Sequence, residues 1–272
     1  MKNVLLLLIL IFVTFLSYGQ TAEEYYRRGL SKADLEDYQG AIADYSKAIE
    51  LNPVDSYSYS NRGLCKGYIE DYYGAIADYN KAIELNPNDY DAYYFRGLDK
   101  HNLEDYKGAI ADFTNAIEIN PNESYFYFKR GLSKDESKND EGAIEDYNKA
   151  IEINPNEVDA YHFRGGAKSD IKDYQGAIAD YTKAIEIKPN SNEEYSYLFR
   201  GFNKQTLEDY QGAIADYCKA IELNPENDSA YYNRGLSKLK LNEKNSACLD
   251  FFKAKEFGNL KVDKMIKESC NK

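Results

Sequence analysis

The chain has 272 residues and a formal charge of −12, with 34 Lys and Arg against 46 Asp and Glu. This acidic balance argues against a nucleic-acid or anionic-lipid partner, because phosphate contacts need clustered Lys and Arg. It permits a basic partner, although an acidic surface also serves solubility alone.

Residues 1–19 form the first recognisable segment. Met1-Lys2-Asn3 gives a positive start, residues 4–15 are apolar, and Ser17 and Gly19 are small. This pattern predicts a secretory signal peptide cleaved after Gly19, whereas an uncleaved anchor is disfavoured because the apolar run is short for a bilayer span. No Cys follows the cleavage site, so no lipoprotein anchor is expected. We therefore expect a secreted or periplasmic protein without membrane insertion after signal cleavage.

From residue 22 onward a 34-residue period organises the chain. The phrase Gly40-Ala-Ile-Ala-Asp-Tyr45 recurs, with small changes, from starting points at Gly74, Gly108, Gly142, Gly176 and Gly212, and weakly at Ser246. The six prolines keep the same period, from Pro53 to Pro225. A period of this size is typical of a solenoid of stacked helical or strand units.

Each repeat is predicted to contain two antiparallel helices. Two helical faces are marked by the spacing of Tyr25, Gly29 and Lys32, and of Ala41, Tyr45 and Ala48. Asp37 lies between them as a suitable N-cap, and Pro53 follows the end of the second helix. Gly29 recurs in every repeat although Gly costs about 1 kcal/mol inside a helix. We infer that a neighbouring helix passes too close for a side chain there, with Ala41 and Ala48 as the matching small surface.

These residues resemble the signature of the tetratricopeptide repeat (TPR) family, from which Arg28 and Lys32 depart. The resemblance implies an all-α fold, a right-handed α-solenoid superhelix whose first helices line a concave groove. It also implies a protein-binding or scaffolding role without catalysis. Seven repeats are assigned to residues 22–55, 56–89, 90–123, 124–157, 158–193, 194–227 and 228–261. A C-terminal capping helix is expected over residues 260–272.

Two repeats are irregular. In the fourth, Ser137 and Asp140 replace apolar residues of the turn between the helices. Between the fifth and sixth, residues 188–194 contain two extra residues, which solenoids place in loops.

Catalytic chemistry is not predicted. The two histidines, His101 and His162, have no metal-ligand spacing, and no Gly-rich phosphate loop is present. We therefore expect no catalytic residue, metal or cofactor. Arg28 and Asp44 recur in all seven repeats; they could grip a ligand, but an ion pair between the two helices is favoured, because an invariant residue cannot encode ligand position.

The variable positions of the first helices carry the candidate binding site. They supply aromatic rings on the face opposite Tyr25 and Gly29, and aromatic residues on such a face are the usual anchors of a peptide site. Either the rings face a groove, or they pack between neighbouring first helices. The candidate groove residues are Tyr94, Phe95, Tyr125, Phe128, His162, Phe163, Tyr195 and Phe199.

The sequence thus favours an exported, non-enzymatic TPR scaffold that binds a peptide or protein segment in this groove. The alternatives are a structural subunit of an oligomer or envelope assembly, and a glycan-binding accessory protein, since aromatic rings can stack on sugars. The family's clamp for chaperone C-termini is rejected, because Tyr26 and Leu30 occupy the places of its Lys and Asn.

The sequence contains four cysteines. Cys65 and Cys218 belong to repeats far apart in the array and are not expected to pair. Cys248 lies on the last full helix and Cys270 on the expected cap, so a disulfide between them is favoured over two buried thiols in an exported protein.

Overall fold

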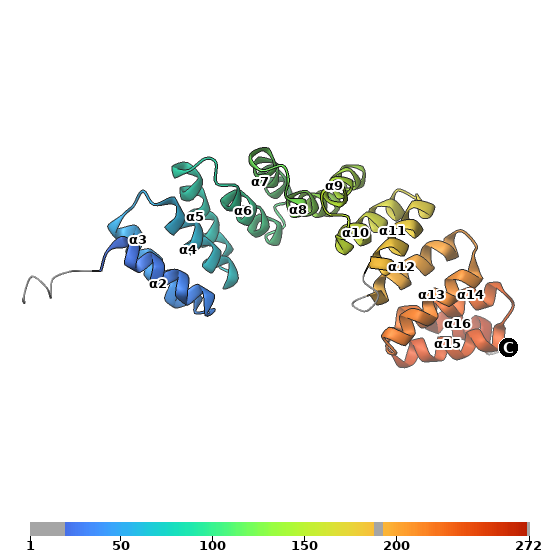
Figure 1. Ribbon diagram of the computed structural model, residues 1–272. Helices are drawn as coiled ribbons and strands as arrows, with labels where there is room; N and C mark the ends of the chain where they lie inside the picture. Colours follow the sequence, from blue (N-terminus) through green and yellow to red (C-terminus); the bar gives the residue numbers. More distant parts are fainter. Residues whose placement is uncertain (1–19, 188–192, 271–272) are drawn as a thin grey trace, which may run out of the picture. The chain divides into compact units, whose positions relative to one another are not determined.

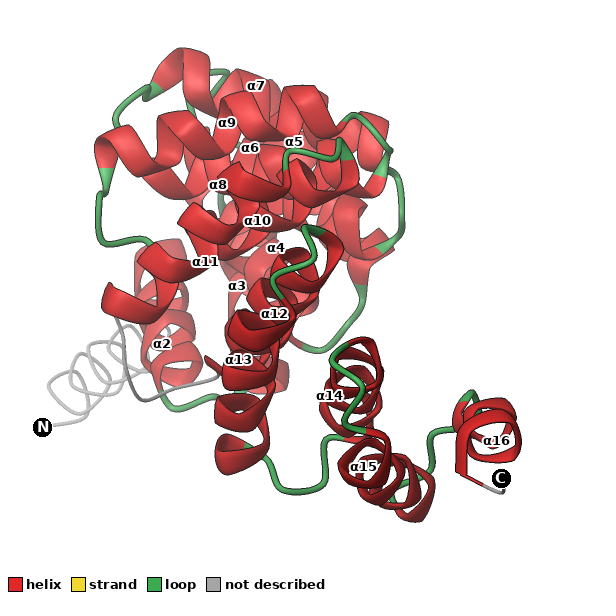
Figure 2. Cartoon of the chain, turned by 90° about the vertical axis from the view of Figure 1, so that its right-hand side faces the viewer, coloured by secondary structure: helices red, strands yellow, loops and turns green. Residues whose placement is uncertain are grey.

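The computed structural model describes residues 20–187 and 193–270. These residues form helices joined by short loops, and no strand occurs among them (Figure 2). The predicted signal peptide, residues 1–19, lies outside the described residues. None of the helices in the described part of the chain is long and apolar enough to cross a bilayer.

The described repeats contain two helices each, as the periodicity predicts. The first helices are α2 (Ala22–Asp34), α4 (Ser56–Tyr68), α6 (Tyr90–Asn102), α8 (Ser124–Glu136), α10 (Val158–Asp170), α12 (Glu193–Thr206) and α14 (Asp228–Lys240). The second helices are α3 (Tyr38–Leu51), α5 (Tyr72–Leu85), α7 (Tyr106–Ile119), α9 (Asp140–Ile153), α11 (Tyr174–Ile187), α13 (Tyr210–Leu223) and α15 (Lys244–Glu256). A short cap, α16 (Val262–Met265) and the π-helical η1 (Ile266–Cys270), follows them.

The chain divides into two compact units, Met1–Pro121 and Asn122–Lys272. The N-terminal unit contains α2 to α7 and the C-terminal unit contains α8 to η1 (Figure 1). Within each unit, helices that follow one another in the sequence pack together as tandem antiparallel pairs. The fold is therefore an α-solenoid of helix-turn-helix repeats.

A three-residue turn joins the two helices of each repeat. In the first repeat, the Asp37 carboxylate accepts a hydrogen bond of 3.0 Å from the Gly40 backbone N–H, which confirms the predicted N-cap. The preceding Glu36 has a left-handed backbone, with φ of 62°. Equivalent residues with positive φ are Glu70, Glu104, Lys138, Lys172, Glu208 and Asn242. The turn geometry is thus the same throughout, although no glycine marks it.

The two helices of a repeat meet where the glycine equivalent to Gly29 faces an aromatic ring. A Cβ atom on Gly29 would lie 2.7 Å from the Tyr45 ring, so no side chain fits there. The prediction of close approach is correct, but the partner was wrongly assigned to Ala41 and Ala48. Both alanines are buried in the same core, while the ring fills the space over the glycine. The corresponding rings are Tyr79, Phe113, Tyr147, Tyr181, Tyr217 and Phe251.

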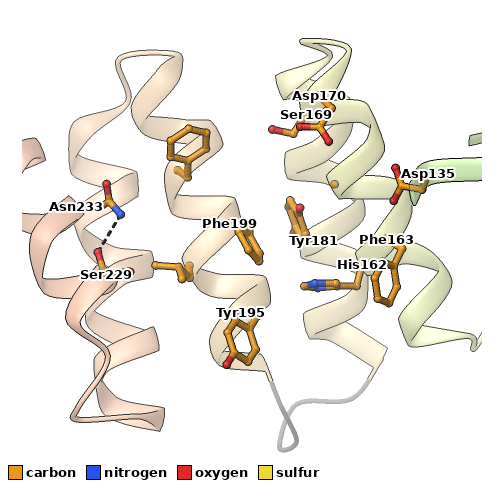
Figure 3. Close-up of a pocket in the computed structure, with 13 residues that line it drawn as sticks. Asp135, His162, Phe163, Ser169, Asp170, Tyr181, Tyr195, Phe199, Ser229 and Asn233 are labelled. Carbon is orange, nitrogen blue, oxygen red and sulfur yellow. Dashed lines mark hydrogen bonds between the residues drawn. The ribbon is translucent and has the colours of Figure 1, made fainter. Parts of the chain in front are cut away.

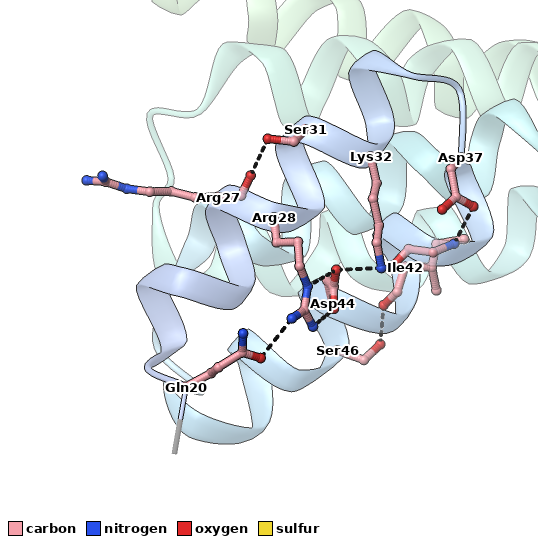
Figure 4. Close-up of polar contacts among 10 residues, drawn as sticks. Gln20, Arg27, Arg28, Ser31, Lys32, Asp37, Ile42, Asp44 and Ser46 are labelled. Carbon is pink, nitrogen blue, oxygen red and sulfur yellow. Dashed lines mark hydrogen bonds and ion pairs between the residues drawn. The ribbon is translucent and has the colours of Figure 1, made fainter. Parts of the chain in front are cut away.

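An ion-pair network joins the same two helices along their other edge (Figure 4). The Arg28 guanidinium donates two hydrogen bonds to the buried Asp44 carboxylate, and Lys32 lies 2.8 Å from it. Across the seven repeats the Arg Nε–Asp oxygen distance is 2.7–3.0 Å. The hydrogen bond from Arg28, together with Lys32, lowers the pKa of Asp44 to about 2. This confirms the ion-pair interpretation of Arg28 and Asp44. It also explains why Lys32 departs from the TPR signature, because Lys32 pairs with the same carboxylate.

The same arginines also connect one repeat to the one before it. The Arg62 Nη1 atom donates to the Ser46 hydroxyl at 3.0 Å, and Arg96 donates to the Asn80 side chain at 2.6 Å. In the C-terminal unit, Arg164, Arg200 and Arg234 make the corresponding bonds to Asn148, Thr182 and Cys218. Each of these arginines therefore holds three helices together.

A disulfide fixes the cap to the last full repeat. Cys248 on α15 and Cys270 in η1 are bonded, with their Cα atoms 5.7 Å apart, and so form the pair expected from the sequence. Val262 is buried against Ala247, Phe251 and Ala254, which completes the core of the seventh repeat. Cys65 and Cys218 are free thiols.

The irregular repeats keep their helices. Ser137 is exposed in the turn between α8 and α9. The equivalent Ile69, Ile171 and Leu207 are 38–40% exposed, so the fourth repeat lacks a partly buried apolar side chain at this position. Residues 188–192 of the predicted insertion lie outside the described residues. The flanking helices α11 and α12 end at Ile187 and begin at Glu193, so both are complete.

The buried rings opposite the glycines should dominate the stability of each repeat. We expect Tyr79→Ala or Tyr147→Ala to lower the free energy of unfolding by about 3–5 kcal/mol, because both rings are almost fully buried. Exposed Lys81→Ala should change it by less than about 0.5 kcal/mol. Thermal and denaturant unfolding of the three variants measures the ranking, and the reverse order would refute the assigned inner face.

The disulfide should stabilise the C-terminal end. In the chain-entropy model a loop of 22 residues corresponds to roughly 3 kcal/mol. We expect Cys270→Ala to lower the stability of the last repeat by about that amount at most, and hydrogen exchange of α15 reports it. Peptide mapping of non-reduced protein that finds free thiols at Cys248 and Cys270 would contradict the bond.

Candidate functional site

A groove of the C-terminal unit lies along its first helices (Figure 3). Its volume is about 590 Å³. Helix α10 supplies His162, Phe163 and Gly166, helix α12 supplies Tyr195, Phe199 and Phe202, and α14 supplies Ser229 and Asn233. The remaining lining residues are Asp135, Ser169, Asp170, Tyr181 and Leu198. We call this feature the aromatic groove.

A glycine creates the space at the centre of the aromatic groove. Gly166 occupies a position at which five other repeats have leucine, namely Leu30, Leu64, Leu98, Leu132 and Leu236. A Cβ atom on Gly166 would meet only the Tyr181 hydroxyl, at an ordinary contact distance of 3.7 Å. The fifth repeat therefore leaves an opening where other repeats place a side chain. The sixth repeat has Phe202 at the same position, 47% exposed beside this opening.

Two phenylalanines form the walls of the groove. Phe163 is 37% exposed and packs edge-on against the rings of Phe128 and His162. Phe199 is 40% exposed and stacks on Tyr181, with ring centroids 6.0 Å apart. Each ring is thus held on one side by neighbouring rings and open on the other, which is how interface anchors are pre-organised.

His162 is a neutral part of this wall. Burial lowers the pKa of its imidazole below the ordinary value, and its Nδ1 atom lies 2.9 Å from the Ser196 hydroxyl. The ring also contacts Tyr181 and Phe199. It therefore shapes the aromatic groove and brings no positive charge at neutral pH.

Carboxylates line one end of the aromatic groove. Asp135 reaches it from α8 and Asp170 from the end of α10 (Figure 3). Burial raises the pKa of Asp135 to about 6, and the charges of Asp140, Asp170 and Glu136 act in the same direction. Lys138 opposes them without reversing the effect. None of the described residues that line the groove is Lys or Arg.

The predicted groove residues separate into four groups. His162, Phe163, Tyr195 and Phe199 line the aromatic groove, as proposed from the sequence. Phe128 is buried beneath Phe163 and Tyr147, so it packs between helices and supports the groove from behind. Tyr125 packs against its neighbour Phe126 near the start of α8. Tyr94 and Phe95 belong to the N-terminal unit, half-buried against Phe113 and Tyr79.

The sequence analysis missed the residues that make the groove hollow and acidic. Gly166 and Phe202 could have been found, because they are the only two departures from leucine at that position among the seven repeats. Asp135 stands where other repeats have Ala33, Gly67 and His101, so the only sequence signal for it is that this position varies between repeats. Only the fold shows that this position and that of Asp170 reach the same groove.

Profiles of known families match most of the sequence. Profiles described as "Tetratricopeptide repeat" match residues 22–55, 56–89, 90–123 and 158–191, and a profile described as "TPR repeat" matches residues 136–168 and 207–242. The chain belongs to the tetratricopeptide repeat family. A search of curated protein sequences finds no match to this TPR protein.

Solved TPR structures resemble the chain. MamA is 28% identical, with a TM-score of 0.57, over 58% of this chain and 93% of MamA. YrrB, described as "a TPR protein with an unusual peptide-binding site", is 24% identical, with a TM-score of 0.61, over 68% of this chain and 95% of YrrB. The C-terminal part of a TPR protein from Cytophaga hutchinsonii is 18% identical, with a TM-score of 0.77, over 91% and 100% of the two chains. YrrB and the Cytophaga protein support the fold alone.

A different buried carboxyl lies in the N-terminal unit of this TPR protein. Asp99 on α6 is 6% exposed, and one of its oxygens has no hydrogen-bond partner among the described residues. Burial raises its pKa to about 7. The equivalent residue of the sixth repeat is Asn203, whose amide donates to the Phe199 carbonyl at 2.8 Å. Asp99 thus puts an ionisable carboxyl at a position where the sixth repeat has a neutral amide.

Asp99 should make the stability pH-dependent. Its folded-state pKa of about 7 exceeds the unfolded value of about 3.9, so stability falls as the pH rises from about 4 to 7. We expect Asp99→Asn to raise the free energy of unfolding by roughly 1–3 kcal/mol at about pH 8. The gain should shrink towards about pH 5.5, where Asp99 is protonated in the folded protein. Denaturant unfolding at both pH values tests this, and an equal effect at both would refute it.

Proposed function

We propose that this TPR protein is an exported, non-enzymatic scaffold that binds a peptide or protein segment in the aromatic groove. The single observation that carries the proposal is the opening at Gly166. Five repeats fill this position with leucine; a Cβ atom would fit here, and leucine would favour the helix by about 0.8 kcal/mol. A glycine that weakens its helix and exposes the rings around it is best explained by an occupant of the groove.

The shape of the groove supports a peptide ligand. Phe163 and Phe199 stand on successive first helices, and rigid, partly exposed rings lose little conformational freedom when they contact a partner. The groove also continues past them. Phe202, Ser229 and Asn233 line a neighbouring hollow that extends to Asn259 and Leu260 at the cap. This length suits an extended segment better than a compact small molecule.

Export is proposed from residues 1–19 alone. The positive start, the apolar run and the small residues before Gln20 are the support. The Cys248–Cys270 disulfide is consistent with an oxidising compartment. Mass spectrometry of protein isolated from its own cells should find Gln20 at the N-terminus, and an intact Met1 would refute cleavage.

The groove residues should control binding without controlling folding. We expect Gly166→Leu to abolish capture of the partner while keeping or raising the melting temperature, since leucine restores the side chain of the other repeats. Phe163→Ser/Phe199→Ser should weaken binding by about tenfold to a hundredfold or more. The measurement is pull-down from the extracytoplasmic fraction, followed by calorimetry with the captured partner.

Tyr73→Ser is the matched control. Tyr73 is 77% exposed on α5, outside the aromatic groove, so its replacement should leave binding of the captured partner unchanged. Unchanged capture by both groove variants would place the site elsewhere on the protein.

Self-association is a second candidate function, favoured by the last repeat. Leu249 and Phe252 on α15 are 69% and 50% exposed, and Leu260 before the cap is 90% exposed. In earlier repeats the position of Phe252 holds a polar group that accepts a bond from the next arginine, as Ser46 does. An apolar residue at this end could contact a second copy. Light scattering measures the oligomeric state: an oligomer that Leu249→Ser/Phe252→Ser converts to monomer would support self-association.

A further inference from the structure

We propose that the opening at Gly166 takes the side chain of a lysine or arginine in the bound segment. The apolar stem of that side chain would lie against Phe163 and Phe199, and its charged head would face Asp135 and Asp170. This inference rests on the proposed function, because it names the chemistry of the segment that the aromatic groove binds.

The walls of the opening suit a long cationic side chain. Lysine and arginine carry apolar stems that pack on hydrophobic surface while their heads stay in a polar place. Phe163, Phe199, Phe202 and Tyr181 line the groove together with Gly166, and aromatic rings also attract cations over their faces. A hollow made only for a neutral apolar side chain would have no need of acids at its end.

The carboxylate of Asp135 differs from the structural carboxylates of the same unit. Asp180 on α11 is paired with Arg164 and Lys168, at distances of 2.5 and 2.8 Å. Asp135 is partly buried and has no ion pair of that kind with any described residue, and the charge of Asp170 adds to its own at this end of the groove. An arriving cation would neutralise a negative charge that Lys138 offsets only in part.

Other occupants fit less well. A neutral or acidic side chain would remove water from Asp135 and Asp170 without supplying an opposite charge, which is unfavourable for a carboxylate. The net charge of −12 on the whole chain also favours a basic ligand, because it attracts positively charged segments. Charge complementarity therefore selects a basic segment.

The test is to select, from a display library of random heptapeptides, those peptides that bind the mature protein. We expect the selected peptides to carry Lys or Arg next to an apolar residue. A labelled peptide of the selected sequence, titrated by fluorescence anisotropy, should bind Asp135→Asn/Asp170→Asn about tenfold or more weakly. Glu141→Gln/Glu145→Gln is the control: it makes the same change in charge at exposed residues on α9 outside the groove, and should bind nearly as the wild type.

The outcomes separate the two proposals. Selected peptides that lack Lys and Arg, yet lose binding to Phe163→Ser/Phe199→Ser, would overturn this inference and keep the peptide-binding function. Equal weakening by the two charge variants would also overturn it, since the effect would then be one of net charge. If no peptide is enriched, or if only glycan probes shift the groove residues in NMR spectra, both proposals fail.

Discussion

The aspartate of each second helix is the point on which the rest of the repeat depends. Asp44 is buried, and its charge is tolerated only because Arg28 and Lys32 of the first helix both reach it. The arginine needs this partner equally, and in most repeats its remaining nitrogen binds the preceding repeat. It also lies over the ring of a tyrosine one turn earlier, as Arg28 does over Tyr25, at 4.8 Å. One set of side chains therefore fixes the helix pair and its contact with the preceding repeat.

Because these contacts lie on the invariant faces, the opposite face of the first helix is free to vary. The glycine opposite each buried ring brings the two helices of a repeat close together in the same way every time. Variation at Phe163, Gly166 and Phe199 then changes the groove and leaves the spacing of the helices alone. In a solenoid each repeat contacts only its neighbours, so such local changes remain local. The aromatic groove is a consequence of this separation of structural and variable positions.

Recurrence explains what the sequence could predict. The helix pairs, the Asp37 cap and the Arg28–Asp44 pair are repeated seven times or nearly so, and each has a local physical reason. The sequence could not show whether Tyr45 or Ala41 lies opposite Gly29, because both lie one turn apart on the buried face of the second helix. The left-handed Glu36 carries no residue-type signal. The aromatic groove depends on departures from the repeat, at Gly166 and Asp135, whose meaning appears only when neighbouring helices are placed together.

Gly166 shows how binding and stability are opposed within one repeat. A Cβ atom on the preceding Gly165 would lie only 3.1 Å from the Tyr181 ring, so packing favours glycine there and the fifth repeat carries two consecutive glycines in one helix. The first glycine serves the fold, while the second weakens α10 and opens a space over the Tyr181 hydroxyl. The repeat tolerates this loss because its arginine, lysine and aspartate still hold both helices. A regular array can therefore hold one locally weakened repeat, whose surface differs from that of its neighbours at Gly166.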